Sequence, residues 1–223
     1  QNLHLLQDEK PEYIIILSGD HIYKMDYLKM LQYHIAQKAD LTVSGIEIEK
    51  SAAHQFGVMV VDNENRIIEF QEKPKEPTPL PGKDDYCYVN MGIYIFNSES
   101  LARVLVDDAK KKESHHDFGK NVIPSILDKY RVFAYNFEDE NKTAKPYWRD
   151  IGTLDSYYDA SMDLVSVSPV FNLYDMDWPI RTYQGQYPPA KNVFAEPEEN
   201  GRMGVALDSI VSGGCIISGG KVV

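Results

Sequence analysis

The sequence predicts an α/β protein with a mostly parallel sheet, helices on both of its faces, and the start of a β-helix at its end. Three observations support this prediction. Strand-like apolar runs alternate with helix-like segments up to about residue 165. The first run, at 13–18, is nearly all apolar, as in a strand covered on both faces. After residue 200, apolar residues recur every six positions beside a repeated Ser-Gly-Gly, which is typical of hexapeptide β-helices.

The first strand leads directly to an aspartate. Asp20 follows the run at 13–18, and ligands of open α/β sheets bind just beyond the carboxyl ends of such strands. Asp20 is therefore placed to hold Mg²⁺ against substrate phosphates. A side-chain cap on the turn after the strand explains Asp20 equally well. Asp26 then predicts the start of a helix, with a core face made of Leu28, Leu31 and Ile35.

The middle of the chain reads as strands joined by turns. Residues 41–48 and 89–96 are apolar runs that predict strands. Residues 58–61 and 67–70 flank a turn-rich Asp-Asn-Glu-Asn, which predicts a hairpin. Residues 75–85 contain three prolines and a glycine, so we expect an exposed loop there.

Polar caps mark the later helices. Asn97 or Ser98 predicts a helix with three inward residues, Asp117 predicts a helical turn, and Thr153 predicts a further helix. A strand is expected at 132–137. In the first of these helices the expected inward residues are Leu101, Val104 and Leu105. In the last, the apolar residues Leu154, Tyr158, Met162 and Val165 are expected on one side.

Composition divides the chain into three parts. Residues 1–165 carry the β/α alternation, 166–200 are rich in proline and predict a wrapping linker, and 201–223 carry the six-residue repeat. One apolar column of the repeat is Val205, Val211, Ile217 and Val223, and the second is Ile210, Ile216 and Val222. An ordinary Gly-rich β tail is the alternative to the β-helix.

Charge and composition exclude several kinds of partner. The net charge of −11 argues against a nucleic-acid surface, which needs a basic footprint. No apolar stretch approaches the roughly 20 residues of a spanning helix, so we expect no membrane partner. The start of the chain has no signal-peptide pattern. Cys87 and Cys215 lie far apart, which predicts two free thiols and a cytoplasmic location.

An ordered set of short motifs runs along nearly the whole chain, and with it the chain resembles the glucose-1-phosphate adenylyltransferase (ADP-glucose pyrophosphorylase) family. The resemblance implies a Rossmann-like sheet of the nucleotide-diphospho-sugar transferase type, within 1–165, and the start of a left-handed parallel β-helix. The motifs are Ser18-Gly19-Asp20-His21-Ile22-Tyr23, Phe56-Gly57-Val58-Met59, Glu72-Lys73-Pro74, Met91-Gly92-Ile93-Tyr94, His116-Asp117-Phe118-Gly119, Tyr147-Trp148-Arg149-Asp150-Ile151-Gly152-Thr153, Trp178-Pro179-Ile180-Arg181-Thr182 and Val211-Ser212-Gly213-Gly214-Cys215.

The resemblance implies that ATP and glucose 1-phosphate react to give ADP-glucose and pyrophosphate in glycogen or starch synthesis. Such chemistry depends on positioning and charge neutralisation. Asp20 and Asp150 match the family's two catalytic, metal-binding aspartates, so Mg²⁺ is the implied cofactor. For Asp150, an ion pair with Arg149 or a turn into the helix at Thr153 is the structural alternative.

Four residues match the family's glucose 1-phosphate site. Lys73 is expected to hold the phosphate as a compact charge, and Glu72 to bind sugar hydroxyls. Gly57 matches a glycine where the backbone approaches the sugar, and Asn90 stands where many relatives carry serine. Without the family, Glu72 and Lys73 would be a solvated pair on a turn, and Gly57 a plain turn glycine.

A few further charged residues and histidines have weaker indications of a role. Asp117 is interpreted as a helix cap, and the adjacent His115 and His116 as a solvated turn in preference to a metal site. Arg181 and Lys191 are candidates for allosteric anions, although solvated cations explain them as well.

The family's Gly-rich, Arg-containing ATP loop does not occur in this sequence. We therefore expect no adenylyltransferase activity from this polypeptide alone. An open β-helix edge predicts self-association, and the family implies a homotetramer.

Three alternatives remain open. The chain could belong to a pyrophosphorylase with another nucleotide or sugar phosphate, since the base pocket lies mostly outside this sequence. It could belong to a non-catalytic regulatory subunit of the same oligomer, although such a subunit has no chemical need for Asp20, Lys73 and Asp150. A hexapeptide-repeat acyltransferase would need many more β-helix coils.

Overall fold

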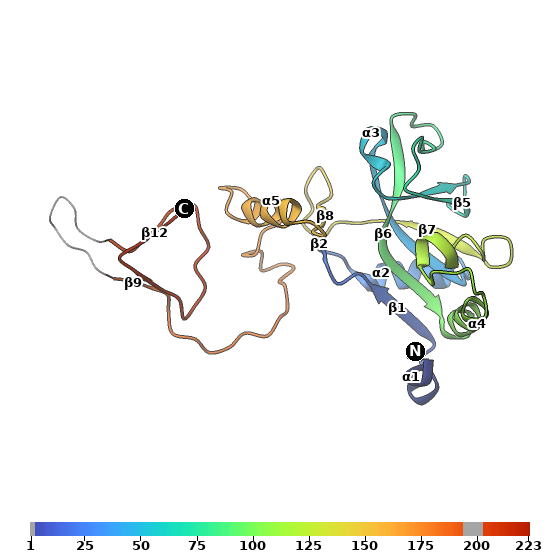
Figure 1. Ribbon diagram of the computed structural model, residues 1–223, viewed down its shortest axis with the longest axis horizontal. Helices are drawn as coiled ribbons and strands as arrows, with labels where there is room; N and C mark the ends of the chain where they lie inside the picture. Colours follow the sequence, from blue (N-terminus) through green and yellow to red (C-terminus); the bar gives the residue numbers. More distant parts are fainter. Residues whose placement is uncertain (1–2, 194–202) are drawn as a thin grey trace. The chain divides into compact units, whose positions relative to one another are not determined.

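A computed structural model describes residues 3–193 and 203–223 of the chain (Figure 1). The described residues form two compact units. The first contains residues 3–19 and 25–138, and the second contains residues 20–24 and 139–223 outside the gap. The chain thus leaves the first unit for five residues, directly after Gly19, and then returns to it.

A six-stranded sheet forms the centre of the first unit. In spatial order it contains β5 (Ile67–Glu72), β4 (Gly57–Val61), β6 (Tyr86–Asn97), β3 (Leu41–Glu49) and β7 (Val132–Asn136), and β1 (Tyr13–Leu17) also pairs with β6. Strands β1, β3, β4 and β7 point in one direction, whereas β5 and β6 run against them. The α/β fold class is confirmed. However, β6 lies between strands of opposite direction, so β3–β7 is the one parallel pair of this described sheet.

Helices cover both faces of this sheet. On β3, Thr42 bonds to His34 of α2 (Tyr27–Ala36) at 2.8 Å. Leu41 and Val43 instead belong to the core cluster that contains Leu101 of α4 (Ser98–Ala109). Because alternate side chains of a strand point to opposite faces, α2 and α4 lie on opposite sides of the sheet. The remaining helices of this unit are α1 (Leu3–Glu9), α3 (Lys50–Ala53) and the π-helix η1 (Phe118–Val122).

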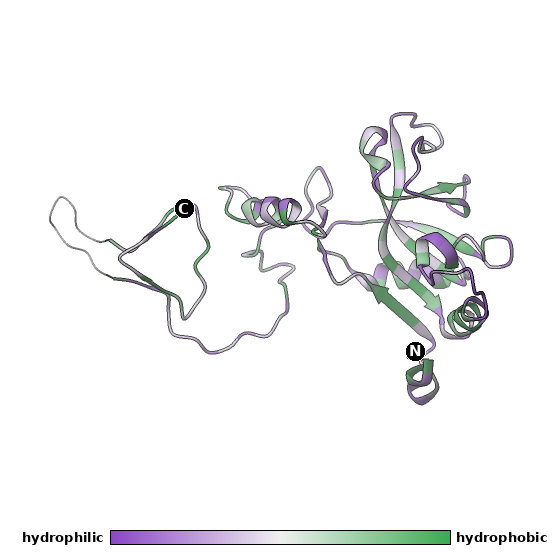
Figure 2. Ribbon diagram, in the orientation of Figure 1, coloured by the Kyte–Doolittle hydropathy of each residue, from purple (hydrophilic) through white to green (hydrophobic). Residues whose placement is uncertain are grey.

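Strand β1 departs from the prediction. The run at 13–18 was expected to be covered on both faces, but Ile15 and Leu17 are 41% and 44% exposed. In the described residues β1 pairs with β6 alone, so it is an edge strand. Figure 2 shows that β1 is nonetheless strongly hydrophobic.

The predicted core face of α2 is wrong for two of its three residues, while the third, Leu31, is half-buried. Asp26 does cap this helix, since its Oδ1 accepts a hydrogen bond from the N–H of Leu28 at 2.9 Å. The buried residues of α2 are Met30 and His34, four positions apart, whereas Leu28 and Ile35 are exposed. The polar His34 is buried because Thr42 and Asn97 satisfy its two ring nitrogens.

Most other elements of the first unit agree with the predictions. The β4–β5 hairpin closes over Asp62, whose carbonyl oxygen accepts the N–H of Asn65. Asn97 is the N-cap of α4, yet its side chain bonds to His34 and to the carbonyl of Ala39 instead of to the helix. Leu101 and Val104 are buried, and Leu105 packs against the same core.

The second unit contains short strands and one helix. Strands β2 (His21–Tyr23) and β8 (Trp148–Asp150) form an antiparallel pair, and α5 (Leu154–Leu164) follows. Strands β9 (Lys191–Val193) and β11 (Ile216–Ser218) pair in parallel, as do β10 (Val205–Ala206) and β12 (Lys221–Val222). These parallel pairs agree with the predicted start of a β-helix, and β9 lies inside the range predicted as linker. The predicted linker residues 194–200, and the first two predicted β-helix residues, lie outside the described residues.

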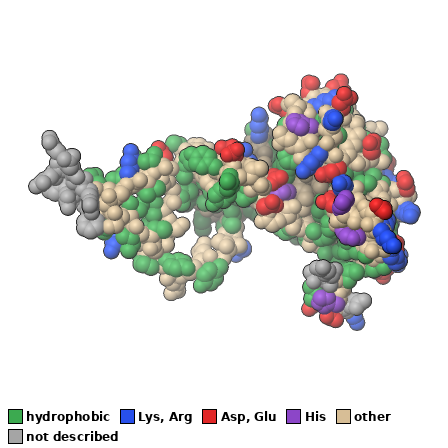
Figure 3. All heavy atoms as spheres, in the orientation of Figure 1, with side chains coloured by type: hydrophobic (Ala, Val, Ile, Leu, Met, Phe, Trp, Pro, Cys, Tyr) green, Lys and Arg blue, Asp and Glu red, His purple; other side chains and the backbone are tan. Residues whose placement is uncertain are grey.

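Large apolar side chains are exposed on this second unit (Figure 3). Thr153 caps α5 through a reciprocal pair of hydrogen bonds with Ser156, as predicted. The apolar side of α5 is largely exposed, since Leu154, Tyr158 and Met162 are 88%, 63% and 43% exposed. The small Ala160 is the buried residue of α5. In the described part of the chain, no helix is long and apolar enough to span a membrane.

Candidate active site

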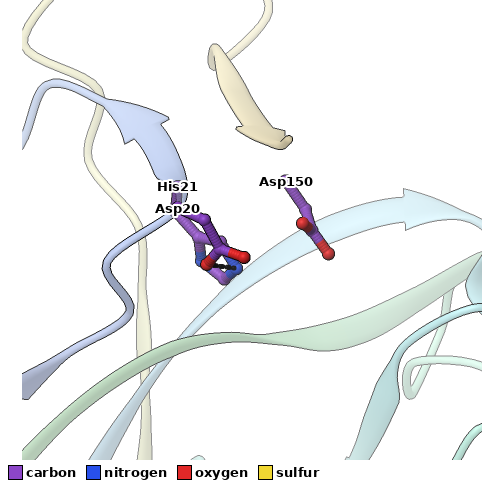
Figure 4. Close-up of side chains that lie close together, drawn as sticks. All are labelled: Asp20, His21 and Asp150. Atoms are coloured by element: carbon purple, nitrogen blue, oxygen red, sulfur yellow. Dashed lines mark ion pairs between the residues drawn. The ribbon is translucent and has the colours of Figure 1, made fainter. Parts of the chain in front are cut away.

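The β2–β8 pair brings together two aspartates that are far apart in the sequence. In this ladder His21 lies opposite Asp150, and the N–H of Ile151 donates to the carbonyl of Asp20 at 3.1 Å. One ligand atom from each of Asp20, His21 and Asp150 lies within 4.8 Å of the others. Figure 4 shows these three side chains at the end of the two strands. The predicted convergence of Asp20 and Asp150 is therefore present, whereas their role stays a prediction.

The surroundings of this cluster fix its side chains. The His21 ring packs edge-on against the Trp148 indole at 5.2 Å between centroids, and its Nε2 lies 3.7 Å from a carboxylate oxygen of Asp20. The N–H of Gly152 donates to Asp150 Oδ1 at 2.9 Å. A Cβ on Gly152 would come within 3.0 Å of that oxygen and 4.0 Å of Asp20 Oδ2. The glycine therefore leaves room for both carboxylates.

The donor set of this cluster fits a divalent cation. Two carboxylate oxygens are the ligands by which Mg²⁺ is usually bound in proteins, together with water and substrate phosphates. The Asp20 carboxylate is 60% exposed, so substrate oxygens have access to it. Sequence reasoning placed Arg149 as an alternative partner of Asp150. In the structure Arg149 bonds instead to Asp163 of α5, which leaves Asp150 to the cluster.

In the first unit, Glu72 lies between two glycines. Gly57 on β4 is the cross-strand partner of Glu72 on β5. A Cβ on Gly57 would lie 2.7 Å from the Phe70 ring and 3.2 Å from Glu72 Oε2, and a Cβ on Gly119 would lie 2.8 Å from that same oxygen. Gly57 was predicted to admit the sugar, but the side chains that need its space in the described structure are Phe70 and Glu72.

The charge environment of Glu72 is mixed. Partial burial, and then the nearby Asp117 carboxylate, raise the pKa of Glu72, while Lys73 and Lys120 act to lower it. Asp117 is also the helix cap that was predicted, since its Oδ1 accepts the N–H of Lys120 at 2.7 Å. Both cationic and anionic side chains thus act on Glu72, a mixture that suits a ligand with both an anionic group and hydroxyls.

Lys73 adopts a rare backbone conformation. Its φ is 45°, in the left-handed region, and the next residue is Pro74. Its N–H bonds to the carbonyl of Phe56 at 3.1 Å, which holds this conformation in place. Residues other than glycine rarely adopt this conformation, and those that do are often found at functional sites. The fixed backbone conformation restricts the direction in which the Lys73 side chain leaves the chain, as expected for a ligand-binding lysine.

Asn90 is engaged by the protein itself. Its Nδ2 donates to the Tyr94 hydroxyl at 2.8 Å, and its Oδ1 accepts the N–H of Gly92 at 2.9 Å. Burial raises the pKa of Tyr94 to about 12, and Asp117 and Glu72 act in the same direction. The Tyr94 ring stacks on Phe118 at 5.3 Å between centroids. Asn90 therefore orients Tyr94 toward the Glu72 region, whatever else it contacts.

Sequence reasoning missed part of this cluster. Tyr94, Phe118 and Gly119 lie in motifs that were noted, but they were given no role. The sequence Asp117-Phe118-Gly119 could have indicated the role of this segment, but only its aspartate was interpreted, as a helix cap. His116, by contrast, bonds to the buried Asp108 at 2.7 Å. Among the described residues, Asp20, His21 and Asp150 form a group able to hold a metal.

Comparison with known proteins adds two family matches. Residues 1–167 match a nucleotidyl transferase model, and residues 188–223 match a GlmU-like C-terminal hexapeptide model. The second match agrees with the parallel strand pairs among β9–β12.

Curated relatives match the whole chain. Glucose-1-phosphate adenylyltransferases from Rhodopirellula baltica, Methylococcus capsulatus and Saccharophagus degradans are 51%, 52% and 54% identical to it. Each match covers 100% of this chain, and 50%, 52% and 52% of the respective relatives. The chain thus spans about half the length of these curated relatives.

Proposed function

Because the chain belongs to the nucleotidyl transferase family, we propose that it supplies metal-binding and acceptor-binding residues of a glucose-1-phosphate adenylyltransferase. This enzyme converts ATP and glucose 1-phosphate to ADP-glucose and pyrophosphate. The observation that carries the proposal is the meeting of Asp20 and Asp150 at one end of the β2–β8 ladder. Two carboxylates that lie close together repel each other when both are ionised, and a bound cation removes that repulsion.

In this reaction, a phosphate oxygen of glucose 1-phosphate forms a bond to the α-phosphorus of ATP. The bond from that phosphorus to the bridging oxygen breaks, and pyrophosphate leaves with the bonding electrons. Asp20 and Asp150 would hold Mg²⁺, which when bound neutralises phosphate charge. The two aspartates thereby fix where the phosphates lie, and positioning is the main source of catalysis in phosphoryl transfer.

The residues around Glu72 are proposed to bind glucose 1-phosphate. The Lys73 ammonium group binds the phosphate of glucose 1-phosphate as a point charge. The Glu72 carboxylate accepts hydrogen bonds from sugar hydroxyls, and Gly57 and Gly119 keep space free beside it. Asn90 holds the Tyr94 hydroxyl in this region and has a second amide N–H to offer a ligand.

Metal binding by the 223-residue chain tests the proposal directly. Mn²⁺ is titrated into the chain, and free Mn²⁺ is measured by electron paramagnetic resonance. We expect Asp20→Asn and Asp150→Asn each to weaken binding strongly, because each substitution removes one of two anionic ligands. Asp155→Asn, on an exposed aspartate of α5, is the matched control and keeps wild-type affinity. Equal affinities for all four proteins would refute the metal role.

Turnover of the protein as its gene encodes it separates the alternatives. A catalytic subunit loses most ADP-glucose formation in Asp20→Asn, whereas a regulatory subunit changes only its response to effectors. Parallel assays with other nucleoside triphosphates and sugar phosphates identify the substrates. The cytoplasmic location, the homotetramer and the allosteric control stay predictions.

A further inference from the structure

Lys24 is a buried cation that joins two segments of the second unit. Its side chain is 2% exposed. Its Nζ donates to the carbonyl of Asn172 at 3.0 Å and to Asp175 Oδ2 at 3.1 Å, and it lies 5.7 Å from the centroid of the Phe171 ring. A buried ammonium group is costly unless it is paired and hydrogen-bonded. These contacts therefore hold the segment 171–175 firmly against Lys24.

The segment 171–175 is shaped to receive this cation. Asn172 Oδ1 accepts the N–H of Tyr174, and Asp175 Oδ1 accepts the N–H of Asp177. These two side-chain turns leave the Asn172 carbonyl and the second Asp175 oxygen free to meet at Lys24 Nζ. The hydrogen bond from Lys24, and the N–H groups of the turn, lower the pKa of Asp175. The ion pair is thus part of an ordered local structure.

Lys24 directly follows β2, which carries the candidate metal ligands at its other end. Strands β2 and β8 contain three residues each, and an isolated two-stranded ladder of that length is not stable in water. Contacts with other segments must therefore stabilise this two-stranded ladder. On β8 the anchor is Arg149, which bonds to Asp163 through two nitrogens at 3.1 and 2.8 Å.

On the β2 side the anchor is Lys24. Its carbonyl accepts the N–H of Glu140 at 3.1 Å, and its ammonium group holds 171–175. Phe171, which is 4% exposed, also packs against Tyr147 at 5.3 Å between centroids. Tyr147 in turn donates its hydroxyl to Asp163, the partner of Arg149. The two anchors are thus joined through Phe171 and Tyr147.

We propose that Lys24 is a positioning residue, whose buried ion pair with Asp175 holds β2 against β8 and so keeps Asp20 beside Asp150. This inference rests on the proposed metal role of the two aspartates. It makes the proline-rich segment after α5 part of the metal site's support, although that segment supplies no ligand. Partners outside the ligand set typically change metal affinity by about 10- to 100-fold when they are removed.

The test compares Mn²⁺ affinity in Lys24→Met, Asp175→Asn and the double variant of the 223-residue chain. We expect each single variant to bind Mn²⁺ at least about tenfold more weakly. The double variant should bind no more weakly than Lys24→Met, because both changes remove the same interaction. Lys24→Arg, which keeps a cation, should retain more affinity than Lys24→Met.

Two controls separate positioning from general destabilisation. Lys29→Met removes the exposed pair of Lys29 and Glu138 and should leave Mn²⁺ affinity unchanged. Ala160→Gly weakens the buried face of α5 and should lower the melting temperature of the second unit without a comparable loss of affinity.

Hydrogen exchange gives a readout that needs no metal. The amide of Ile151, which bonds to the Asp20 carbonyl, should exchange faster in Lys24→Met than in Ala160→Gly. If Lys24→Met keeps both Mn²⁺ affinity and Ile151 protection while Asp20→Asn abolishes binding, the positioning role is overturned and the metal site stands. If the wild-type chain does not bind Mn²⁺, both proposals fall.

Discussion

The two units hold their candidate site residues by different means. In the first unit, Glu72 and Asn90 lie on strands of a six-stranded sheet, and core residues such as Ile93 and Phe96 are 0% exposed. In the second unit, Asp20 and Asp150 lie at the ends of three-residue strands, beside a helix whose large side chains are exposed. Packing therefore positions the first group, whereas buried and half-buried ion pairs position the second.

This difference affects how tolerant each site is of substitution. A packed core distributes the stabilisation over many contacts, each of which is small. The β2–β8 ladder depends on a few charged anchors, and removal of one partner of a buried pair leaves the other uncompensated. Core substitutions should therefore act mainly on the stability of the first unit, and anchor substitutions mainly on the geometry of the second.

The largest expected effect tests the packing side of this comparison. Phe96→Ala removes a fully buried ring from the first unit and should lower its free energy of unfolding by about 3–5 kcal/mol. Hydrogen exchange of β3 and β6 amides measures this loss. Tyr158→Ala on α5 is the matched control, since that ring is 63% exposed and its removal should change stability by about 0.5 kcal/mol or less.

Fluorescence sharpens the same experiment. Both tryptophans of the chain, Trp148 and Trp178, belong to the second unit. Tryptophan emission during denaturation thus reports on the second unit, while β3 and β6 amides report on the first. Comparable losses of stability from Phe96→Ala and Tyr158→Ala would contradict the contrast between a packed and an exposed unit.

A pair of glycine substitutions gives a smaller effect and separates stability from site geometry. In Gly57→Ala the new Cβ would meet the buried Phe70 ring at 2.7 Å, so we expect a loss of about 1–3 kcal/mol from overpacking. In Gly119→Ala it would meet Glu72 Oε2 at 2.8 Å, the end of a flexible side chain that can move. Gly119→Ala should therefore cost less stability.

Ligand binding distinguishes the two variants further. Because Gly119→Ala displaces the Glu72 carboxylate, it should weaken binding of glucose 1-phosphate, measured by calorimetry on the protein as its gene encodes it. Equal melting temperatures for both variants would show that Phe70 moves as easily as Glu72, and would weaken the argument that packing fixes this site.

Local signals in the sequence predicted most of the elements. The caps at Asp26, Asp117 and Thr153 and the turn at Asp62 depend on hydrogen bonds within a few residues, so the sequence carries them directly. The burial of whole faces depends on distant partners. The exposed sides of β1 and α5, and the inward direction of His34, could not be predicted for that reason.

The candidate site divides in the same way. The rule for strand ends and the family motifs predicted that Asp20 and Asp150 would converge, and the ladder of β2 and β8 agrees. The anchors of that ladder could not be predicted, because Lys24 and Asp175 are 151 positions apart and no local pattern marks them as partners. The structural use of Gly57 was missed for the same reason, since its neighbour Phe70 lies on the paired strand.

The smallest expected effect concerns the charge on Glu72. Its pKa in the folded protein is raised, mainly by partial burial, so the folded state holds the proton more tightly than the unfolded state does. Stability therefore falls as the pH rises through the window from the ordinary glutamate value to the raised value, and the penalty persists above it. Glu72→Gln removes this penalty and should raise the melting temperature slightly at neutral pH.

The melting temperatures of wild type and Glu72→Gln at several pH values show whether the charge on Glu72 causes the difference. The gain in melting temperature from Glu72→Gln should shrink as the pH falls below the ordinary pKa of glutamate, because wild-type Glu72 is then protonated in both states. If Glu72→Gln is also the variant that binds glucose 1-phosphate more weakly, the first unit keeps a destabilising charge where a ligand needs it. A pH-independent gain would assign the effect to packing.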